Sequence, residues 1–175
     1  MSPDTQLSRF VPRRWDELVA LLQGHGFDIA DNTHPRYPNE WRDDPPLGLV
    51  RVKGVWLPNA DTDPDADEDR RVTFSLMERW SVKPTPFALV EREGLWLAGY
   101  AYNGHIAGNG RNDGDRNHRH DFDPMKTDDI VYHRHPFGES NKIRVPEAPI
   151  SAGGALDDFR AVLAEEITAG LLDVE

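Results

Sequence analysis

The sequence predicts an α+β fold, an antiparallel β-sheet with N- and C-terminal helices packed on one face. Three observations support this prediction. Apolar residues recur at helical spacing near both ends of the chain, alternating segments lie between them, and turn residues separate those segments. Helices beside a run of antiparallel strands define the α+β class. The chain has 175 residues, the size of one domain, so we expect residues 1–175 to form a single domain.

The first helix is predicted over residues 12–23. Pro12 suits the first turn, where its missing N–H is not needed, and Gly24 or Gly26 ends the helix. The apolar positions that show the helical spacing are Val11, Trp15, Leu18, Val19 and Leu22. Residues 28–47 show no sustained period, so we expect a long loop there.

Four strands are expected next, at Leu49 to Leu57, 71–82, Phe87 to Arg92 and Leu95 to Tyr102. Gly54 is expected at a turn or bulge of the first strand, and Glu93-Gly94 at a turn between the last two. The second strand alternates most clearly. Its apolar side chains, expected on one face, are Val72, Phe74, Leu76, Trp80 and Val82.

Two polar segments resemble ligand-binding loops without meeting their requirements. The acidic run Asp61–Asp69 has Ala66 and Val72 where a calcium loop needs glycine and glutamate, so we expect a solvated loop. The segment Gly108-Asn-Gly110 is not followed by a helical pattern, which favours a flexible hairpin connection over a phosphate-binding loop.

The second helix is expected from about residue 155. Its apolar stripe consists of Leu156, Phe159, Val162, Leu163 and Ile167. Asp157 and Asp158 are expected in the first turn, where the helix dipole favours negative charge.

The composition excludes several classes of protein. Without cysteine the chain has no disulfide, thiolate metal site or cysteine nucleophile. No apolar run approaches the roughly 18 residues of a transmembrane helix, and residues 1–6 do not resemble the start of a signal peptide. We therefore expect a cytoplasmic protein without a membrane partner.

The charge balance is strongly acidic. Acidic residues outnumber basic ones 31 to 20, which argues against non-specific binding to duplex DNA or anionic membranes. Only four of the basic residues are lysines. A carboxylate surplus with few lysines suits a salt-rich cytoplasm, so we expect a halophilic protein. The alternative is an ordinary acidic protein from a GC-rich genome.

We predict that the melting temperature rises between low salt and about 1 M potassium chloride, because salt at that concentration screens charge repulsion beyond about 3 Å. Melting curves at the two salt concentrations test this expectation. A melting temperature that does not change with salt would contradict the halophilic interpretation.

Histidines gather in one part of the chain. Five of the seven lie between positions 105 and 135: His105, His118, His120, His133 and His135. The last four form two His-x-His pairs, and on a strand each pair directs both imidazoles to one face. Arginines are interleaved with them, so this region concentrates the cations of an acidic protein.

Three interpretations of the histidines compete. They could be solvated surface residues. They could bind zinc or another divalent ion with Asp121, although the neighbouring arginines would repel a dication. They could also cleave RNA without a metal, with one imidazole activating a 2′-hydroxyl, a second protonating the leaving 5′-oxygen, and an arginine stabilising the phosphorane.

A series of short motifs over residues 87–169 resembles the TumE family, the toxins of certain prokaryotic toxin–antitoxin pairs. The motifs are Tyr100-Ala-Tyr102, Arg119-His120-Asp121, His133-Arg134-His135 and Gly138-Glu139, followed by Pro146, Pro149 and a helix. The resemblance implies a small toxin that acts on RNA and is held inactive by a helix-turn-helix antitoxin. His120 stands where the family has a tyrosine, Phe122-Asp-Pro-Met replaces expected histidines, and the first 70 residues match nothing in the family.

The favoured hypothesis is a metal-independent ribonuclease without a cofactor. His133 and His135 would be the acid–base pair, and Asp121 would orient an imidazole. Arg119 and Arg134 would hold the phosphate. Tyr100 and Tyr102 would stack a base, unless they are half-buried sheet residues. The alternative is a non-catalytic metal- or nucleotide-binding module built on the histidine cluster.

Overall fold

The computed structural model of the chain describes residues 3–30, 47–56, 72–107, 117–124, 131–140 and 142–169. The helices are α1 (Pro3–Gly24) and α2 (Ala152–Thr168). The strands are β1 (Asp28–Ile29), β2 (Leu47–Trp56), β3 (Val72–Ser81), β4 (Glu91–Arg92), β5 (Leu95–Ile106), β6 (Asn117–Phe122), β7 (Tyr132–His135) and β8 (Val145–Pro146).

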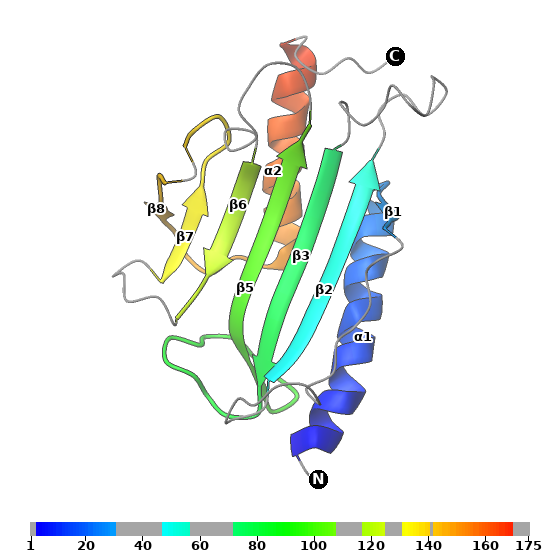
Figure 1. Cartoon of the computed structure of the whole chain (residues 1–175), viewed down its shortest axis with the longest axis vertical. Coiled ribbons are helices and arrows are strands. Elements are labelled where there is room, and N and C mark those ends of the chain that lie inside the picture. Colours follow the sequence, from blue (N-terminus) through cyan, green and yellow to red (C-terminus); the bar gives the residue numbers. More distant parts are fainter. Residues whose placement is uncertain are drawn as a thin grey trace.

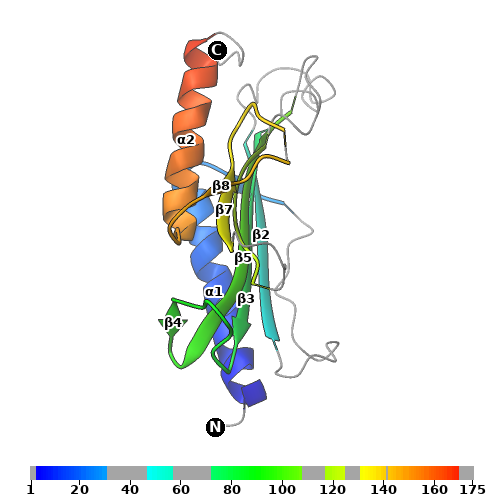
Figure 2. The same ribbon diagram turned by 90° about the vertical axis from the view of Figure 1, so that its left-hand side faces the viewer.

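These strands form one antiparallel sheet in the order β1-β2-β3-β5-β6-β7-β8, and β4 pairs with β5. Both helices lie on the same face of the sheet, α1 beside β2 and α2 beside β5 and β6 (Figures 1 and 2). This arrangement confirms the predicted α+β fold. We call the covered side of the sheet the helix face and the opposite side the outer face.

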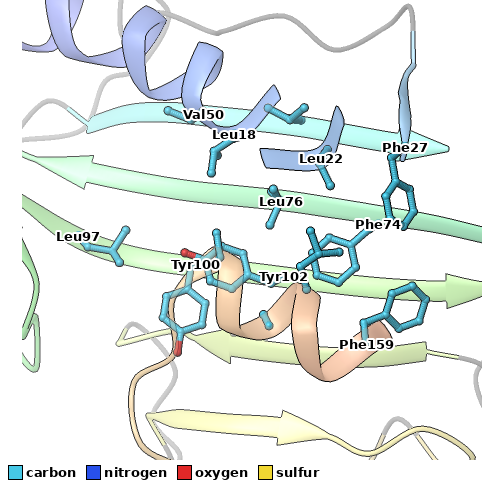
Figure 3. Packing of buried hydrophobic residues seen from close by; sticks show 14 of the residues in the cluster. Leu18, Leu22, Phe27, Val50, Phe74, Leu76, Leu97, Tyr100, Tyr102 and Phe159 are labelled. Atoms are coloured by element: carbon cyan, nitrogen blue, oxygen red, sulfur yellow. The ribbon is translucent and has the colours of Figure 1, made fainter. Parts of the chain in front are cut away.

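The core lies between the helices and the sheet. Leu18 and Leu22 of α1 and Phe159 of α2 point toward side chains of β3 and β5 (Figure 3). Phe159 packs on Phe74 with the ring centroids 5.4 Å apart. A side chain at Gly104 of β5 would overlap the ring of Phe159, so this glycine allows α2 to approach the sheet closely.

Helix α1 begins nine residues before the predicted start, and Pro12 lies inside it. The predicted start at residue 12 was wrong because the burial of apolar side chains before Pro12 outweighs the cost of a proline inside the helix. An interior proline costs about 3 kcal/mol, whereas each large apolar side chain contributes about 1.5–3 kcal/mol when buried. Leu7, Phe10 and Val11 are all buried, and the ring of Phe10 lies 4.7 Å from that of Trp80.

Strand β2 begins at Leu47, inside the predicted loop 28–47, and β1 also lies within that range. Gly54 is neither a turn nor a bulge, because it pairs regularly with Phe74 of β3. Gly54 allows Phe27 to approach β2 closely, since an added Cβ would lie 2.8 Å from Cβ of Phe27. In β3 the apolar side chains predicted to share a face, from Val72 to Trp80, are buried. Glu78 lies on the same face and is also buried.

The strand predicted from Phe87 to Arg92 is mostly wrong, because only Glu91 and Arg92 form β4. Phe87 is exposed and has a φ of 64°, which a strand does not accommodate. The Glu93-Gly94 turn is confirmed, since it joins β4 to β5 with positive φ at both residues. Strand β5 continues to Ile106, four residues beyond the predicted end.

Helix α2 begins at Ala152 after the N-cap Ser151, whose hydroxyl accepts a hydrogen bond from the N–H of Gly154. The earlier start places Asp157 and Asp158 in the second turn instead of the predicted first. The acidic run 61–69 and the segment 108–110 lie outside the described residues. In the described part of the chain, no helix has the length and apolarity needed to cross a membrane.

Candidate functional site

The two histidine pairs lie on the neighbouring strands β6 and β7, but they face opposite sides of the sheet. Directly opposite residues of antiparallel strands share a face. His120 lies opposite Tyr102, a core residue of the helix face, so His118 and His120 point to that face. Asp121 follows His120 on β6 and therefore points to the other face. His133 lies opposite Asp121, so His133 and His135 point to the outer face. Each pair therefore shares a face, as predicted.

All four of these imidazoles are buried, between 1 and 7 % exposed. For them, the interpretation as solvated surface residues is wrong. Buried imidazoles require polar partners, because an unsatisfied polar group in the interior costs about 1–3 kcal/mol. The partners belong to two separate clusters, one on each face.

Asp121 is the centre of the outer-face cluster, which consists of Arg119, Asp121, His133 and His135. The Nε atom of Arg119 donates a hydrogen bond of 2.7 Å to Oδ1 of Asp121. The other oxygen, Oδ2, lies 3.4 Å from Nε2 of His135 and 3.6 Å from Nε2 of His133. One carboxylate therefore contacts all three basic side chains that the sequence assigns to catalysis or phosphate binding on this face.

Within the outer-face cluster, Asp121 and His133 are buried, whereas the side chain of Arg119 is 42 % exposed. Burial lowers the pKa of His135, and the nearby Asp121 carboxylate partly opposes that shift. A lowered pKa keeps this imidazole neutral at pH 7, so that it can accept a proton.

Three of the predicted site residues lie on the helix face instead. Tyr100 and Tyr102 are buried, and their rings stack on one another with centroids 4.5 Å apart. Both hydroxyls are used internally: that of Tyr102 donates to Glu78, and that of Tyr100 accepts from the N–H of Ile150. These tyrosines are core residues, so the prediction that they stack a nucleotide base was wrong.

Arg134 is also separated from the predicted catalytic pair. It is an exposed residue of β7 and lies opposite His120, so its side chain is on the helix face. The predicted partnership of Arg134 with His133 and His135 at one phosphate was therefore wrong, because the sheet lies between them. Of the two predicted phosphate-binding arginines, only Arg119 is on the outer face.

The helix-face cluster contains two carboxylates that the sequence did not connect with histidine. It consists of His118, His120, Glu147 and Asp158. Nδ1 of His120 lies 2.9 Å from Oε2 of Glu147, and its Nε2 lies 3.1 Å from Nε2 of His118 and 3.7 Å from Oδ2 of Asp158. Burial, reinforced by the neighbouring His120, lowers the pKa of His118 to about 4.

Comparison of the chain with protein-family models, with curated proteins and with solved structures found no match. The fold and its clusters define an α+β protein with two histidine–carboxylate clusters on opposite faces of the same pair of strands. Functional inference therefore rests on the chemistry of these two clusters.

Proposed function

We propose that the protein is a metal-independent ribonuclease, with the outer-face cluster as its catalytic site, and that it is the toxin of a toxin–antitoxin pair. The main support is the position of Asp121, whose carboxylate contacts Arg119, His133 and His135 together. The sequence predicts His133 and His135 as the acid–base pair, Asp121 as the residue that orients an imidazole, and Arg119 as a phosphate ligand.

The proposed reaction is transfer of the RNA phosphodiester to the neighbouring 2′-oxygen. One neutral imidazole of the His133–His135 pair takes the proton of the 2′-hydroxyl as that oxygen attacks phosphorus. The second imidazole, protonated, gives its proton to the departing 5′-oxygen, so the products are a 2′,3′-cyclic phosphate and a 5′-hydroxyl. Asp121 stabilises the imidazolium, and Arg119 stabilises the negative charge that develops on the phosphoryl oxygens.

The charges of the outer-face cluster favour chemistry without a metal. Arg119 places a permanent positive charge 2.7 Å from Asp121, the cluster's carboxylate. A divalent cation bound to Asp121 would be repelled by this guanidinium. The same guanidinium is a suitable partner for a phosphate, because its N–H groups match the phosphate oxygens.

A second function is supported by one specific observation. One potential ligand atom from each of Asp121, His133 and His135 lies within 4.8 Å of the others. Two histidines and a carboxylate are a known zinc-ligand set, which fits the alternative of a metal-binding module. The two functions differ in their response to metal removal.

We expect the purified protein to cleave single-stranded RNA in the presence of a chelator, with a bell-shaped pH dependence between roughly pH 5 and 8. The same RNA with 2′-O-methyl groups should not be cleaved, because its 2′-oxygen has no proton to lose. Complete loss of cleavage with chelator and recovery with zinc would favour the metal-dependent function. Absence of cleavage under all these conditions would contradict the ribonuclease proposal and favour the non-catalytic metal-binding module.

The toxin part of the proposal is supported by the resemblance of residues 87–169 to the TumE family. It implies a helix-turn-helix antitoxin as partner. A short helix-turn-helix reading frame next to the gene would support it. Co-expression of that neighbour should then relieve growth inhibition by this chain, whereas unchanged inhibition would contradict the pairing.

A further inference from the structure

We propose that the helix-face cluster binds a divalent transition-metal ion, with His118, His120 and Asp158 as ligands and Glu147 as the residue that positions His120. The two histidines come from β6, Asp158 comes from α2, and Glu147 lies in the connection from β8 to α2. The site is separate from the outer-face cluster, and its existence does not depend on the ribonuclease proposal.

The separation of the two imidazole nitrogens matches that between two ligands of one metal ion, and one ligand atom of each of His118, His120 and Asp158 lies within 4.8 Å of the others. Two nitrogen ligands at about 2.0–2.1 Å from a zinc ion lie about 2.9 Å apart at a right angle and about 3.35 Å apart at the tetrahedral angle. The observed separation of the Nε2 atoms of His118 and His120 is 3.1 Å. Oδ2 of Asp158 lies 3.7 Å from Nε2 of His120, slightly farther than two ligands of one ion. Because the side chain of Asp158 is 52 % exposed, a small rotation can bring its carboxylate to the same ion.

Glu147 fixes the orientation that metal binding needs in His120. Both of its carboxylate oxygens lie within 3.0 Å of Nδ1 of His120, which fits the tautomer with the proton on Nδ1. Nε2 then presents a lone pair toward His118. A carboxylate that holds the far nitrogen of a histidine ligand is a general feature of zinc sites.

The polar partner of His118 among the described residues is the imidazole of His120. Nδ1 of His118 is buried without a hydrogen-bond acceptor or donor among the described residues, whereas its Nε2 faces His120. At most one proton can lie between the two Nε2 atoms. A metal ion held by both nitrogens would use both lone pairs.

Charge distinguishes this cluster from the one on the outer face. The helix-face cluster brings the two carboxylates Glu147 and Asp158 to a pair of imidazoles, and Arg134, the cation opposite His120 on this face, is exposed. The outer-face cluster has one carboxylate, and Arg119 is hydrogen-bonded to it. A dication is therefore attracted more strongly to the helix-face cluster.

The ligand set also indicates which ions would bind. Two imidazoles and a carboxylate suit zinc and the neighbouring transition metals better than magnesium or calcium, which prefer oxygen ligands. Three protein ligands leave a coordination position for water, as in catalytic zinc sites.

The test is metal stoichiometry and affinity of the full-length chain after treatment with chelator and dialysis. Zinc would be titrated in competition with a chromophoric chelator, and cobalt(II) spectra would report the coordination geometry. We expect one site per chain that is lost in the His118→Gln/His120→Gln double variant and retained in the matched outer-face variant His133→Gln/His135→Gln. Glu147→Gln should weaken zinc binding about 10–100-fold without removing a ligand.

Asp158→Asn provides a variant that does not disturb the core, because this side chain is half exposed. We expect it to weaken zinc binding with unchanged circular dichroism. Failure of the wild-type chain to bind zinc or cobalt, or loss of the metal in the outer-face variant alone, would overturn the proposal. RNA cleavage is measured separately, so either proposal can fail without the other.

Discussion

Replacement of His135 by alanine is expected to lower the rate of RNA cleavage about 10²–10⁴-fold, the usual contribution of a general acid or base. The protein should stay folded, because the buried Asp121 loses its contact with His135 but keeps its hydrogen bond from Arg119 and its contact with His133. Cleavage kinetics and circular dichroism of the purified variant are the measurements. Growth inhibition in a host that lacks the antitoxin should disappear in parallel.

Arg119 is tested with two substitutions, since removal of its charge affects Asp121 as well as the substrate. Arg119→Ala leaves the buried Asp121 carboxylate without its hydrogen-bonding cation, which is destabilising. Arg119→Lys keeps the charge but loses the planar group that matches phosphate. We expect the lysine variant to fold and to cleave RNA about 10²–10³-fold more slowly, as when one preorganised donor is removed.

Arg51 and His105 are matched controls for these variants. Both belong to the outer face of the same sheet, Arg51 on β2 and His105 on β5. Their alanine variants should cleave RNA at the wild-type rate. His25, the residue after the end of α1, is less suitable because its Nδ1 lies 3.0 Å from Nη1 of Arg160 on α2. Unchanged cleavage in both His135→Ala and Arg119→Lys would contradict the site, and loss of folding would indicate a structural network.

The sequence predicted which histidines share a face of the sheet but not which of the two faces each pair occupies. Residues i and i+2 share a face of any strand, so the two pairs follow from local geometry. The face depends on the phase of each strand relative to the core. His118 and His120 share the phase of Tyr102, whereas His133 shares that of Asp121. That phase is a property of strand register, which short motifs do not encode.

The same distinction explains the other successes and failures. The Glu93-Gly94 turn was predictable because its chemistry is local, and both residues have the positive φ that such a turn requires. The start of α1 at Pro3 was not predictable from Pro12, because burial of Leu7 and Phe10 against the sheet determines it. Asp158 could be placed on a helix from the sequence. Its approach to His120 depends on how α2 docks.

Glu78 is the most consequential residue that the alternating pattern did not reveal. It lies on the helix face of β3 and is fully buried, at a position between the apolar Leu76 and Trp80. Two nitrogens of Arg14 donate to its carboxylate, at 2.8 Å to Oε2 and 2.7 Å to Oε1. Nε1 of Trp80 and the hydroxyl of Tyr102 each donate a further hydrogen bond, both at 2.9 Å.

These contacts make one carboxylate the shared acceptor for three side chains of α1, β3 and β5. Burial and then the nearby Glu78 carboxylate raise the pKa of Tyr102 well above its ordinary value, so its hydroxyl remains a donor. Removal of Glu78 would leave these donors in the interior without their acceptor. Loss of one partner of a buried ion pair typically costs about 3–5 kcal/mol.

We therefore expect Glu78→Ala to lower the free energy of unfolding by about 3–5 kcal/mol, measured as a shift of the urea midpoint at constant m-value. The control is Glu17→Ala, which removes a half-exposed partner of Arg14 and Arg92 and should cost no more than about 1 kcal/mol. The double variant Arg14→Met/Glu78→Leu removes both charges of the pair and should be more stable than Glu78→Ala, because no buried guanidinium remains. Equal costs for Glu78→Ala and Glu17→Ala would show that Glu78 does not organise the core, since the buried and the exposed carboxylate would then contribute alike.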